Sequence, residues 1–291
     1  MTSGNIACFN GALLPLDEIA ISPLDRGFVF GDGVYEVIPV YNGVMLRARE
    51  HFERLQRSMD EIRLANPYSV DEWIALARRL LAHHPGNQSV YLQVTRGVPP
   101  KRDHVMPKGL KPTVFMMCQP LPSPSREQVD NGVACITARD FRWEKCNIKS
   151  ISLLGNVIAR QMAADADATE CVMFRDGFLT EASASNVFAV KGSTVLAPPM
   201  DNLILLGITY QLLLDLAREG DEKLEVRKVS EAEVRAADEL WLTSSTKEVL
   251  AITTLDGKPV GSGKPGPLFR RMHALYQDYK ARIGKAAEVA A

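Results

Sequence analysis

The sequence has no long apolar run, no paired cysteines and few histidines, and each absence argues against a class of protein. Among its 291 residues, no apolar stretch approaches the roughly 20 residues of a membrane helix, so no membrane partner is expected. The five cysteines are scattered without a C-x-x-C and predict reduced thiols in a cytoplasmic protein. The five histidines are also dispersed, which argues against a multi-histidine metal site. The first residues show no basic region followed by an apolar one, so we expect no signal peptide.

The chain also lacks an excess of charge of either sign. Its 34 Lys and Arg residues face 35 Asp and Glu residues, giving a net charge of −1, so nucleic acid is not an expected partner. It contains no G-x-G-x-x-G, no G-x-x-x-x-G-K-[ST] and no H-E-x-x-H to support a nucleotide or zinc site. With 46% hydrophobic and 24% charged residues it has an ordinary globular composition, and we expect small molecules as its ligands.

The order of predicted strands and helices indicates two α+β domains. At roughly 100–200 residues per domain, the length suggests two. Residues 1–118 contain alternating strand patterns around two amphipathic helices, predicted over 50–64 and 70–84, with hairpin turns at Asn10-Gly11 and Asn42-Gly43. A proline-rich stretch predicts a linker at 119–126. Residues 127–291 form the larger second domain, with further strands, helices and Asp-Gly turns.

One lysine lies in apolar surroundings. Lys149 stands between Ile148 and a run that contains Ile151, Leu153 and Leu154, although lysine is among the residues least often buried. Two interpretations compete. The side chain could lay its methylenes on the core and keep its charge in water. Alternatively, the apolar setting could keep the amine neutral and make it a nucleophile. For a lysine considered alone, the first interpretation is favoured.

Three features of the second half bear on this lysine. Glu181 lies on a predicted strand with small, hydroxylic neighbours, where a buried carboxylate would need a partner. Residues 207–209, Gly-Ile-Thr, begin an amphipathic helix, whose free N–H groups can bind phosphate. Residues 243–246 are four consecutive hydroxyl residues where a strand turns. Each also has an ordinary explanation: a solvent-facing glutamate, an N-cap threonine or a polar loop.

Together, these features form a set that suits pyridoxal 5′-phosphate (PLP). This cofactor requires a lysine for a Schiff base, an acid that pairs with its pyridinium nitrogen and a helix start that takes its phosphate. No single member of the set is specific, but the combination predicts PLP as the cofactor.

Six segments resemble, in order, the motifs of the fold-type IV PLP enzymes: DRGFVFGDGVYEV, EHFERL, IKSISLLGNVIARQ, LTEASASNVF, LLGIT and LTSSTKE. The similarity spans nearly the whole chain. It implies a small α/β N-terminal domain, a larger C-terminal pseudo-barrel domain that carries the PLP lysine, and a homodimer. By this resemblance, Lys149 is the Schiff-base lysine and the catalytic acid and base, and Glu181 pairs with the pyridinium nitrogen. The resemblance further implies that Leu205 packs behind the ring and that the phosphate is bound by Arg54, Ile208, Thr209 and Ser245.

The loop PPKRDHVMP, residues 99–107, bears on the substrate. D-amino-acid transaminases of this family resemble one another in an Arg-x-His pair here, which traps the substrate α-carboxylate together with a tyrosine; the matching residues are Arg102, His104 and Tyr35. A guanidinium binds a carboxylate through two parallel hydrogen bonds. The loop is one residue longer before the arginine than the family pattern, so Lys101 could exchange register with Arg102. The loop could also serve either its own subunit's site or the neighbour's.

The resemblance therefore implies transamination of D-amino acids, of the D-alanine or D-glutamate type, with a 2-oxo acid such as 2-oxoglutarate. Alternatives of the same fold are a branched-chain L-amino-acid aminotransferase, an (R)-amine transaminase and, less favoured, an aminodeoxychorismate lyase. A PLP-binding carrier without turnover is a further class. A carboxylate trap argues against the amine transaminase and the carrier. In the expected reaction, the freed Lys149 moves a proton from the substrate Cα while Glu181 keeps the ring nitrogen protonated.

Overall fold

The structure is a computed structural model that describes residues 5–290, and the side chains of residues 5–283. The described chain divides into two compact units. Unit 1 comprises residues 5–121, 148–153 and 287–290, and unit 2 comprises residues 122–147 and 154–286. The segment 148–153, which carries Lys149, is thus assigned to unit 1. The domain limits expected from the sequence stay a prediction.

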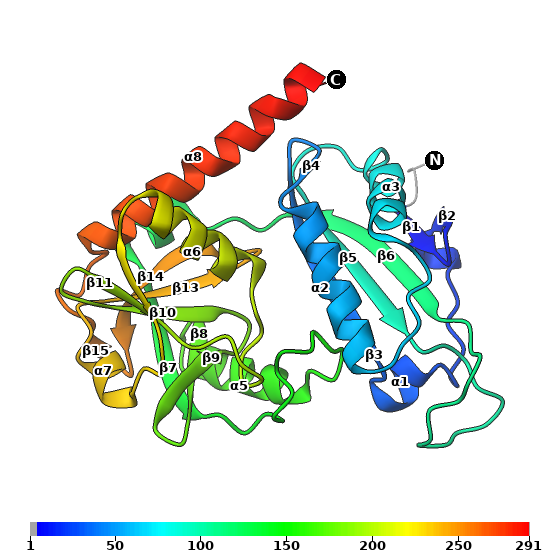
Figure 1. Cartoon of the computed structure of the whole chain (residues 1–291), viewed down its shortest axis with the longest axis horizontal. Helices are drawn as coiled ribbons and strands as arrows, with labels where there is room; N and C mark the ends of the chain where they lie inside the picture. The colour runs from blue at the N-terminus through cyan, green and yellow to red at the C-terminus, as the bar shows by residue number, and fades with distance from the viewer. Residues whose placement is uncertain (1–4, 291) are drawn as a thin grey trace. The chain divides into compact units, whose positions relative to one another are not determined.

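Unit 1 is built on an antiparallel sheet of six described strands in the order β2-β1-β6-β5-β3-β4 (Figure 1). The strands are β1 (Ile6–Phe9), β2 (Ala12–Pro15), β3 (Gly33–Tyr41), β4 (Val44–Met45), β5 (Gln88–Thr95) and β6 (Thr113–Pro120). The predicted turns at Asn10-Gly11 and Asn42-Gly43 are confirmed, since they connect β1 to β2 and β3 to β4. All four turn residues have positive φ, which asparagine and glycine tolerate better than other residues.

The two predicted helices of unit 1 are confirmed and pack on this sheet. They are α2 (Ala48–Glu61) and α3 (Val70–Leu81), and a shorter helix, α1 (Arg26–Phe30), precedes β3. The helices bury apolar residues three or four positions apart in one core with the strands: Phe52, Leu55, Met59, Trp73, Ala77 and Leu80. Helix α1 escapes sequence prediction because five residues are too few to show a helical period.

Unit 2 is built on a mixed sheet whose nine strands lie within residues 122–286, in the order β12-β11-β10-β13-β14-β7-β8-β9, with β15 beside β14 (Figure 1). The strands are β7 (Val133–Arg139), β8 (Glu170–Arg175), β9 (Phe178–Ala182), β10 (Asn186–Lys191), β11 (Thr194–Ala197), β12 (Lys223–Val226), β13 (Glu239–Ser244), β14 (Glu248–Leu255) and β15 (Lys258–Pro259). Strand β9, at the end of this order, also contacts β10, so the sheet curls back toward itself.

Helices cover the sheet of unit 2. They are α4 (Arg126–Asn131), α5 (Leu154–Asp165), α6 (Ile208–Glu219), α7 (Glu231–Arg235) and α8 (Pro267–Ala290). Helix α6 packs on β13 and buries Tyr210, Leu213 and Leu216. The short elements α4, β12 and α7 escape sequence prediction, and α4 begins at Arg126, within the proline-rich stretch. In residues 5–290, no helix combines the length and the apolar character needed to cross a membrane.

A buried ionic network joins β3 to α2 in unit 1. The Glu36 carboxylate is fully buried and contacts the His51 Nδ1 at 2.7 Å. It also accepts hydrogen bonds from Arg54 Nε at 2.8 Å and Arg54 Nη2 at 2.7 Å. Burial opposes the ionisation of Glu36, but the charges of Arg54 and His51 outweigh it and hold the pKa of Glu36 well below its usual range. The network therefore contains a paired, ionised carboxylate inside the core.

We predict that Glu36→Gln lowers the free energy of unfolding by about 3 kcal/mol at pH 7, because it removes the charged partner of a buried ion pair. The folded-state pKa of Glu36 lies below its ordinary value of 4.5, so its stabilisation is complete above pH 4.5 and is lost as the pH falls further. Urea unfolding between pH 7 and pH 3 should show a difference in the free energy of unfolding between wild type and variant. This difference, or gap, should narrow below pH 4.5. Glu53→Gln, at an exposed position of the same helix, is the control and should leave no gap. A gap that is independent of pH would contradict the network.

Candidate active site

The predicted site residues belong to both units, and each unit is described by itself. Unit 1 contains Tyr35, Arg54, Arg102, His104 and Lys149, and unit 2 contains Glu181, Leu205, Ile208, Thr209 and Ser245. Among the residues that the structure describes, no group of three His, Cys, Asp or Glu side chains could hold a metal ion.

Lys149 is fixed through its main chain. Its carbonyl oxygen accepts a hydrogen bond from the Tyr35 N–H at 2.9 Å, and its own N–H donates to Ser58 Oγ at 3.2 Å. The next residue, Ser150, forms an isolated antiparallel bridge with Val34. Ser150 is buried, whereas Lys149 is half-buried. The segment is thus anchored on β3 and on α2 while the lysine side chain keeps access to solvent.

The amine of Lys149 lies against Tyr35. Its Nζ is 4.0 Å from the centroid of the Tyr35 ring. Because side chains alternate along a strand, Tyr35 and the buried Glu36 point to opposite faces of β3. Unit 1 therefore brings together the residue predicted to be catalytic and one residue predicted to bind substrate.

Arg54, predicted to bind phosphate, is buried, and its guanidinium lies against the Glu36 carboxylate. Its side chain is 5% exposed, and two of its guanidinium nitrogens donate to the Glu36 carboxylate. This double contact fixes the plane of the guanidinium. A phosphate contact of Arg54 stays a prediction.

Arg102 and His104 lie on an exposed loop without regular secondary structure, and both contact the Phe30 ring. The Arg102 Cζ is 4.6 Å from the ring centroid, and the His104 ring is 5.1 Å from it. Lys101, the alternative in this register, has a side chain that is 80% exposed and lies 3.9 Å from Asp103. The geometry therefore favours Arg102 over Lys101 as the ordered cation of the loop.

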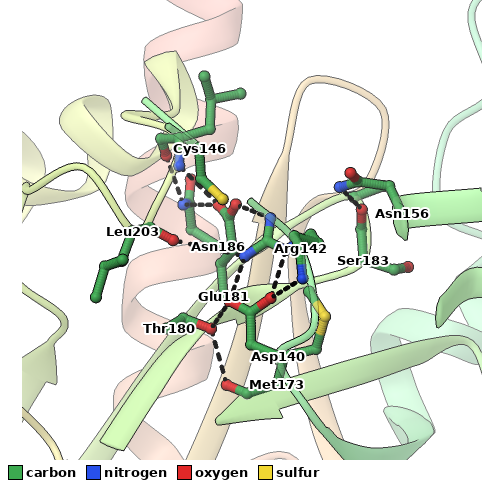
Figure 2. A network of polar contacts seen from close by, with 12 residues as sticks. Asp140, Arg142, Cys146, Asn156, Met173, Thr180, Glu181, Ser183, Asn186 and Leu203 are labelled. Atoms are coloured by element: carbon green, nitrogen blue, oxygen red, sulfur yellow. Dashed lines mark hydrogen bonds and ion pairs between the residues drawn. The ribbon is translucent and has the colours of Figure 1, made fainter. Parts of the chain in front are cut away.

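In unit 2, Glu181 on β9 lies in a buried polar network (Figure 2). Its carboxylate accepts hydrogen bonds from Arg142 Nη1, from Asn186 Nδ2 at 3.1 Å and from the Leu205 N–H at 3.0 Å. Arg142 is held in turn by Asp140, to which its Nε donates at 3.0 Å and its Nη2 at 2.9 Å. Burial raises the pKa of Glu181 to about 7, although Arg142 and the Leu205 amide act to lower it.

Asn186, at the start of β10, joins Glu181 to the beginning of α6. Besides its bond to Glu181, its Nδ2 donates to the Leu205 carbonyl at 2.8 Å. Gly207, the N-cap of α6, has no room for a side chain, because a Cβ would lie 2.2 Å from Asn186 Oδ1. Across the sheet, Asn186 pairs with Thr243 of β13. Unit 2 thus brings together the carboxylate, the helix start and the hydroxyl-rich strand end predicted from the sequence.

The start of α6 offers hydrogen-bond donors. No side chain caps the helix at Gly207, so its first amides, including those of Ile208 and Thr209, have no acceptor within the helix. Among the described residues, the buried Thr243 Oγ1 also has no hydrogen-bond partner. Uncapped amides at the positive end of a helix dipole favour an anion.

Ser245 begins the turn that connects β13 to β14. The turn is closed by the Lys247 N–H, which donates to Ser244 Oγ at 3.0 Å. The Lys247 Nζ donates to Glu170 Oε1 at 2.9 Å, and the same oxygen accepts from Ser185 Oγ at 2.9 Å. Glu170 is fully buried, so it anchors the hydroxyl-rich turn from inside the unit.

These residues of unit 2 fit PLP by their chemistry. A phosphate needs N–H and O–H donors, which the start of α6 and the turn at Ser245 provide. A protonated ring nitrogen needs a carboxylate, which Glu181 provides. The raised pKa of Glu181 means that Arg142 does not fully offset its burial, so a further positively charged partner would stabilise the ionised form.

Sequence reasoning missed the residues that hold the predicted ones: Glu36, Asp140, Arg142, Glu170, Asn186 and Lys247. The sequence pattern could have indicated that Glu36 is buried, because this residue falls on the same face of β3 as the buried Val34 and Ile38. No sequence pattern indicated a role for Arg142, since it lies in an irregular segment and is brought to Glu181 only by the tertiary structure.

The chain is similar to known aminotransferases over most of its length. Residues 33–255 match the family model of class IV amino-transferases. The chain is 41% identical over 271 residues to a D-alanine aminotransferase from Bacillus licheniformis, with 93% of this chain and 95% of the relative covered. It is 38% identical over 270 residues to a D-alanine aminotransferase from Listeria monocytogenes, with 92% and 93% covered.

Solved structures of branched-chain amino acid aminotransferases share its fold. The Escherichia coli enzyme has a TM-score of 0.87 at 22% identity, covering 93% of this chain and 92% of the other. The T.th. enzyme, solved with pyridoxamine 5′-phosphate, also has a TM-score of 0.87 at 22% identity, covering 96% and 94%. These similarities confirm the two-domain α+β, fold-type IV architecture implied by the sequence motifs. The family that those motifs indicated is confirmed as well: the chain belongs to the class IV aminotransferase family.

Proposed function

We propose that this chain transfers the amino group of D-amino acids, of the D-alanine or D-glutamate type, to a 2-oxo acid such as 2-oxoglutarate. The observation that carries this proposal is the 41% identity, over 93% of the chain, to an enzyme named for D-alanine. The loop with Arg102 and His104 supports it, because an ordered, exposed guanidinium suits a substrate carboxylate. Class IV aminotransferases use PLP, which is therefore the cofactor.

PLP supplies an acceptor for the electron pair that remains when the substrate Cα–H bond breaks. We assign two roles to the Lys149 Nζ: it would hold the cofactor, and it would transfer the proton from the substrate Cα. The anchoring of its main chain on Tyr35 and Ser58 supports this role, since a proton-transfer group must be positioned before it can act. Glu181 would hold the proton on the ring nitrogen.

We assign the phosphate of the cofactor to the amides of Ile208 and Thr209, to Ser245 and to Arg54. The uncapped start of α6 and the anchored turn at Ser245 support this assignment. Leu205 would pack behind the ring, and its main chain already bonds Glu181 and Asn186.

We assign the substrate α-carboxylate to Arg102, His104 and Tyr35. Fixing the amine and the carboxylate determines whether the single Cα–H bond or the side chain of the substrate faces the proton-transfer group, and therefore which enantiomer reacts. The contact between Tyr35 and the Lys149 amine supports the inclusion of Tyr35.

We further propose that the protein is a cytoplasmic homodimer. Its five cysteines are all buried free thiols, as expected in a reducing compartment. Helix α5 exposes apolar side chains on one face: Leu154, Val157, Ile158 and Met162. A contiguous exposed apolar surface is typical of a face that another chain covers.

The direct test of the proposed function is a half-reaction scan. D-alanine and D-glutamate should convert the absorbance of the PLP-loaded protein to that of the pyridoxamine form, and 2-oxoglutarate should restore it. L-leucine should react roughly 100-fold more slowly, because with its carboxylate in the same contacts its Cα–H bond points away from the proton-transfer group. Preference for L-leucine would identify a branched-chain aminotransferase instead. Pyruvate release without a 2-oxo acid acceptor would identify a lyase, and an unchanged spectrum a carrier.

Lys149→Ala should lower the transamination rate by about 10³-fold or more, because it removes the group that transfers the proton. Borohydride reduction of the wild-type holoprotein, followed by peptide mass spectrometry, should find a pyridoxyl group on Lys149. Lys145→Ala is the matched control, since Lys145 is an exposed lysine shortly before Lys149 in the chain, and this variant should retain activity. A pyridoxyl group on any other lysine would refute the assignment.

Arg102→Ala should raise the KM for D-alanine roughly 10- to 100-fold, with a smaller effect on kcat, because it removes a charge-assisted hydrogen-bonding partner of the carboxylate. Lys101→Ala tests the alternative register and should leave KM unchanged. Steady-state kinetics over a range of D-alanine concentrations measure both values. An increase in KM for the lysine variant alone would move the assignment to Lys101.

A further inference from the structure

The loop that carries Arg102 and His104 is held by a buried arginine. Residues 101–106 are exposed and have no strand or helix of their own. The Arg26 guanidinium, which is 3% exposed, donates to the loop carbonyls of Asp103 at 2.5 Å, His104 at 3.4 Å and Val105 at 3.4 Å. One planar group therefore holds three consecutive carbonyls of an otherwise irregular loop.

Arg26 is itself fixed from behind. Its Nε donates to Asp32 Oδ2 at 2.7 Å. The Asp32 carboxylate is also bound by Arg96, through Nε at 2.7 Å and Nη2 at 2.9 Å. Arg96 in turn donates to the carbonyls of Ile62 and Arg63, after the end of α2. The loop is thus connected to the framework of unit 1 through two guanidinium groups that share one carboxylate.

Phe30, the last residue of α1, holds the side chains of the loop. Its ring centroid lies 4.6 Å from the Arg102 Cζ, 5.1 Å from the His104 ring and 4.7 Å from the Arg26 Cζ. Helix α1 is capped by Asp25, which accepts from the Gly27 N–H at 2.8 Å. An arginine that lies over an aromatic ring keeps its N–H edge available for a carboxylate. The ring of Phe30 therefore limits the orientations of both predicted carboxylate ligands at once.

We infer that Phe30 and Arg26 are positioning residues for the substrate carboxylate: Arg26 fixes the main chain of the loop, and Phe30 orients Arg102 and His104 on it. This inference rests on the proposed function, in which Arg102 and His104 bind the α-carboxylate. A long side chain on an exposed loop loses conformational freedom when it binds, and ordering it beforehand strengthens binding. Arg26 and Phe30 therefore affect the affinity for the substrate rather than the rate of proton transfer.

The test is Phe30→Leu, measured in the half-reaction with D-alanine. The concentration for half-maximal rate should rise about three- to tenfold, the range expected for loss of one cation–π contact, while the limiting rate stays within about twofold. Phe28→Leu is the matched control, because Phe28 lies on the same helix with 79% exposure, and it should leave both values unchanged. Arg26→Lys keeps a positive charge beside Asp32 but loses the planar set of donors, and should shift the same concentration in the same direction.

Repeating the Phe30→Leu measurement in a protein that lacks both predicted carboxylate ligands distinguishes a positioning role of Phe30 from a general effect on stability. In the Arg102→Ala/His104→Ala protein, Phe30→Leu should change the half-maximal concentration by less than about twofold, because the groups that it orients are already gone. A full effect of Phe30→Leu in this background would overturn the inference. An unchanged half-maximal concentration in Phe30→Leu, with active wild type, would overturn it as well and leave the proposed function intact. A wild-type protein that does not react with D-amino acids would instead remove the proposed function, and the inference with it.

Discussion

In each of the two units, a buried carboxylate bonded to a guanidinium fixes a side chain of the candidate site. Glu36 binds Arg54 in unit 1, and Glu181 binds Arg142 in unit 2. An unpaired buried charge is strongly unfavourable, so each acid restricts the position of its arginine and each arginine that of its acid. The two pairs differ in one respect. Arg54 and His51 hold the pKa of Glu36 low, whereas burial raises that of Glu181 to about 7. Glu36 is therefore stabilised in its ionised form by residues of unit 1, whereas the burial of Glu181 favours its protonated form.

A carboxylate bonded to guanidinium groups also occurs at Asp32, where it holds a loop in place rather than a residue of the core. Asp32 binds Arg96 and Arg26, and Arg26 reaches three loop carbonyls. Burial opposes the ionisation of Asp32, but the two arginines outweigh it and lower its pKa. The exposed loop that carries Arg102 and His104 is thereby held to the framework of unit 1 without becoming a strand or a helix. This explains how a loop of exposed polar residues can present an arginine in a defined place.

Other residues predicted to act at the site are held through their main chains. Lys149 is anchored by its N–H and its carbonyl, and Leu205 by the same two groups. Ile208 and Thr209 contribute through the amides of a helix start that no side chain caps.

The sequence by itself determined the longer helices, the hairpins and the fold class, and it indicated which groups are predicted to react. The hairpins at Asn10-Gly11 and Asn42-Gly43 and the helices α2 and α3 follow from local conformational preference and from the spacing of apolar residues. Lys149 and Glu181 stood out because a charged residue in an apolar segment requires an explanation. Only the tertiary structure decided which partners those residues have. Arg142 reaches Glu181 from an irregular segment, and Phe30 meets Arg102 from a helix of five residues. Such contacts join segments far apart in the chain, and no local period or propensity encodes a distance between them.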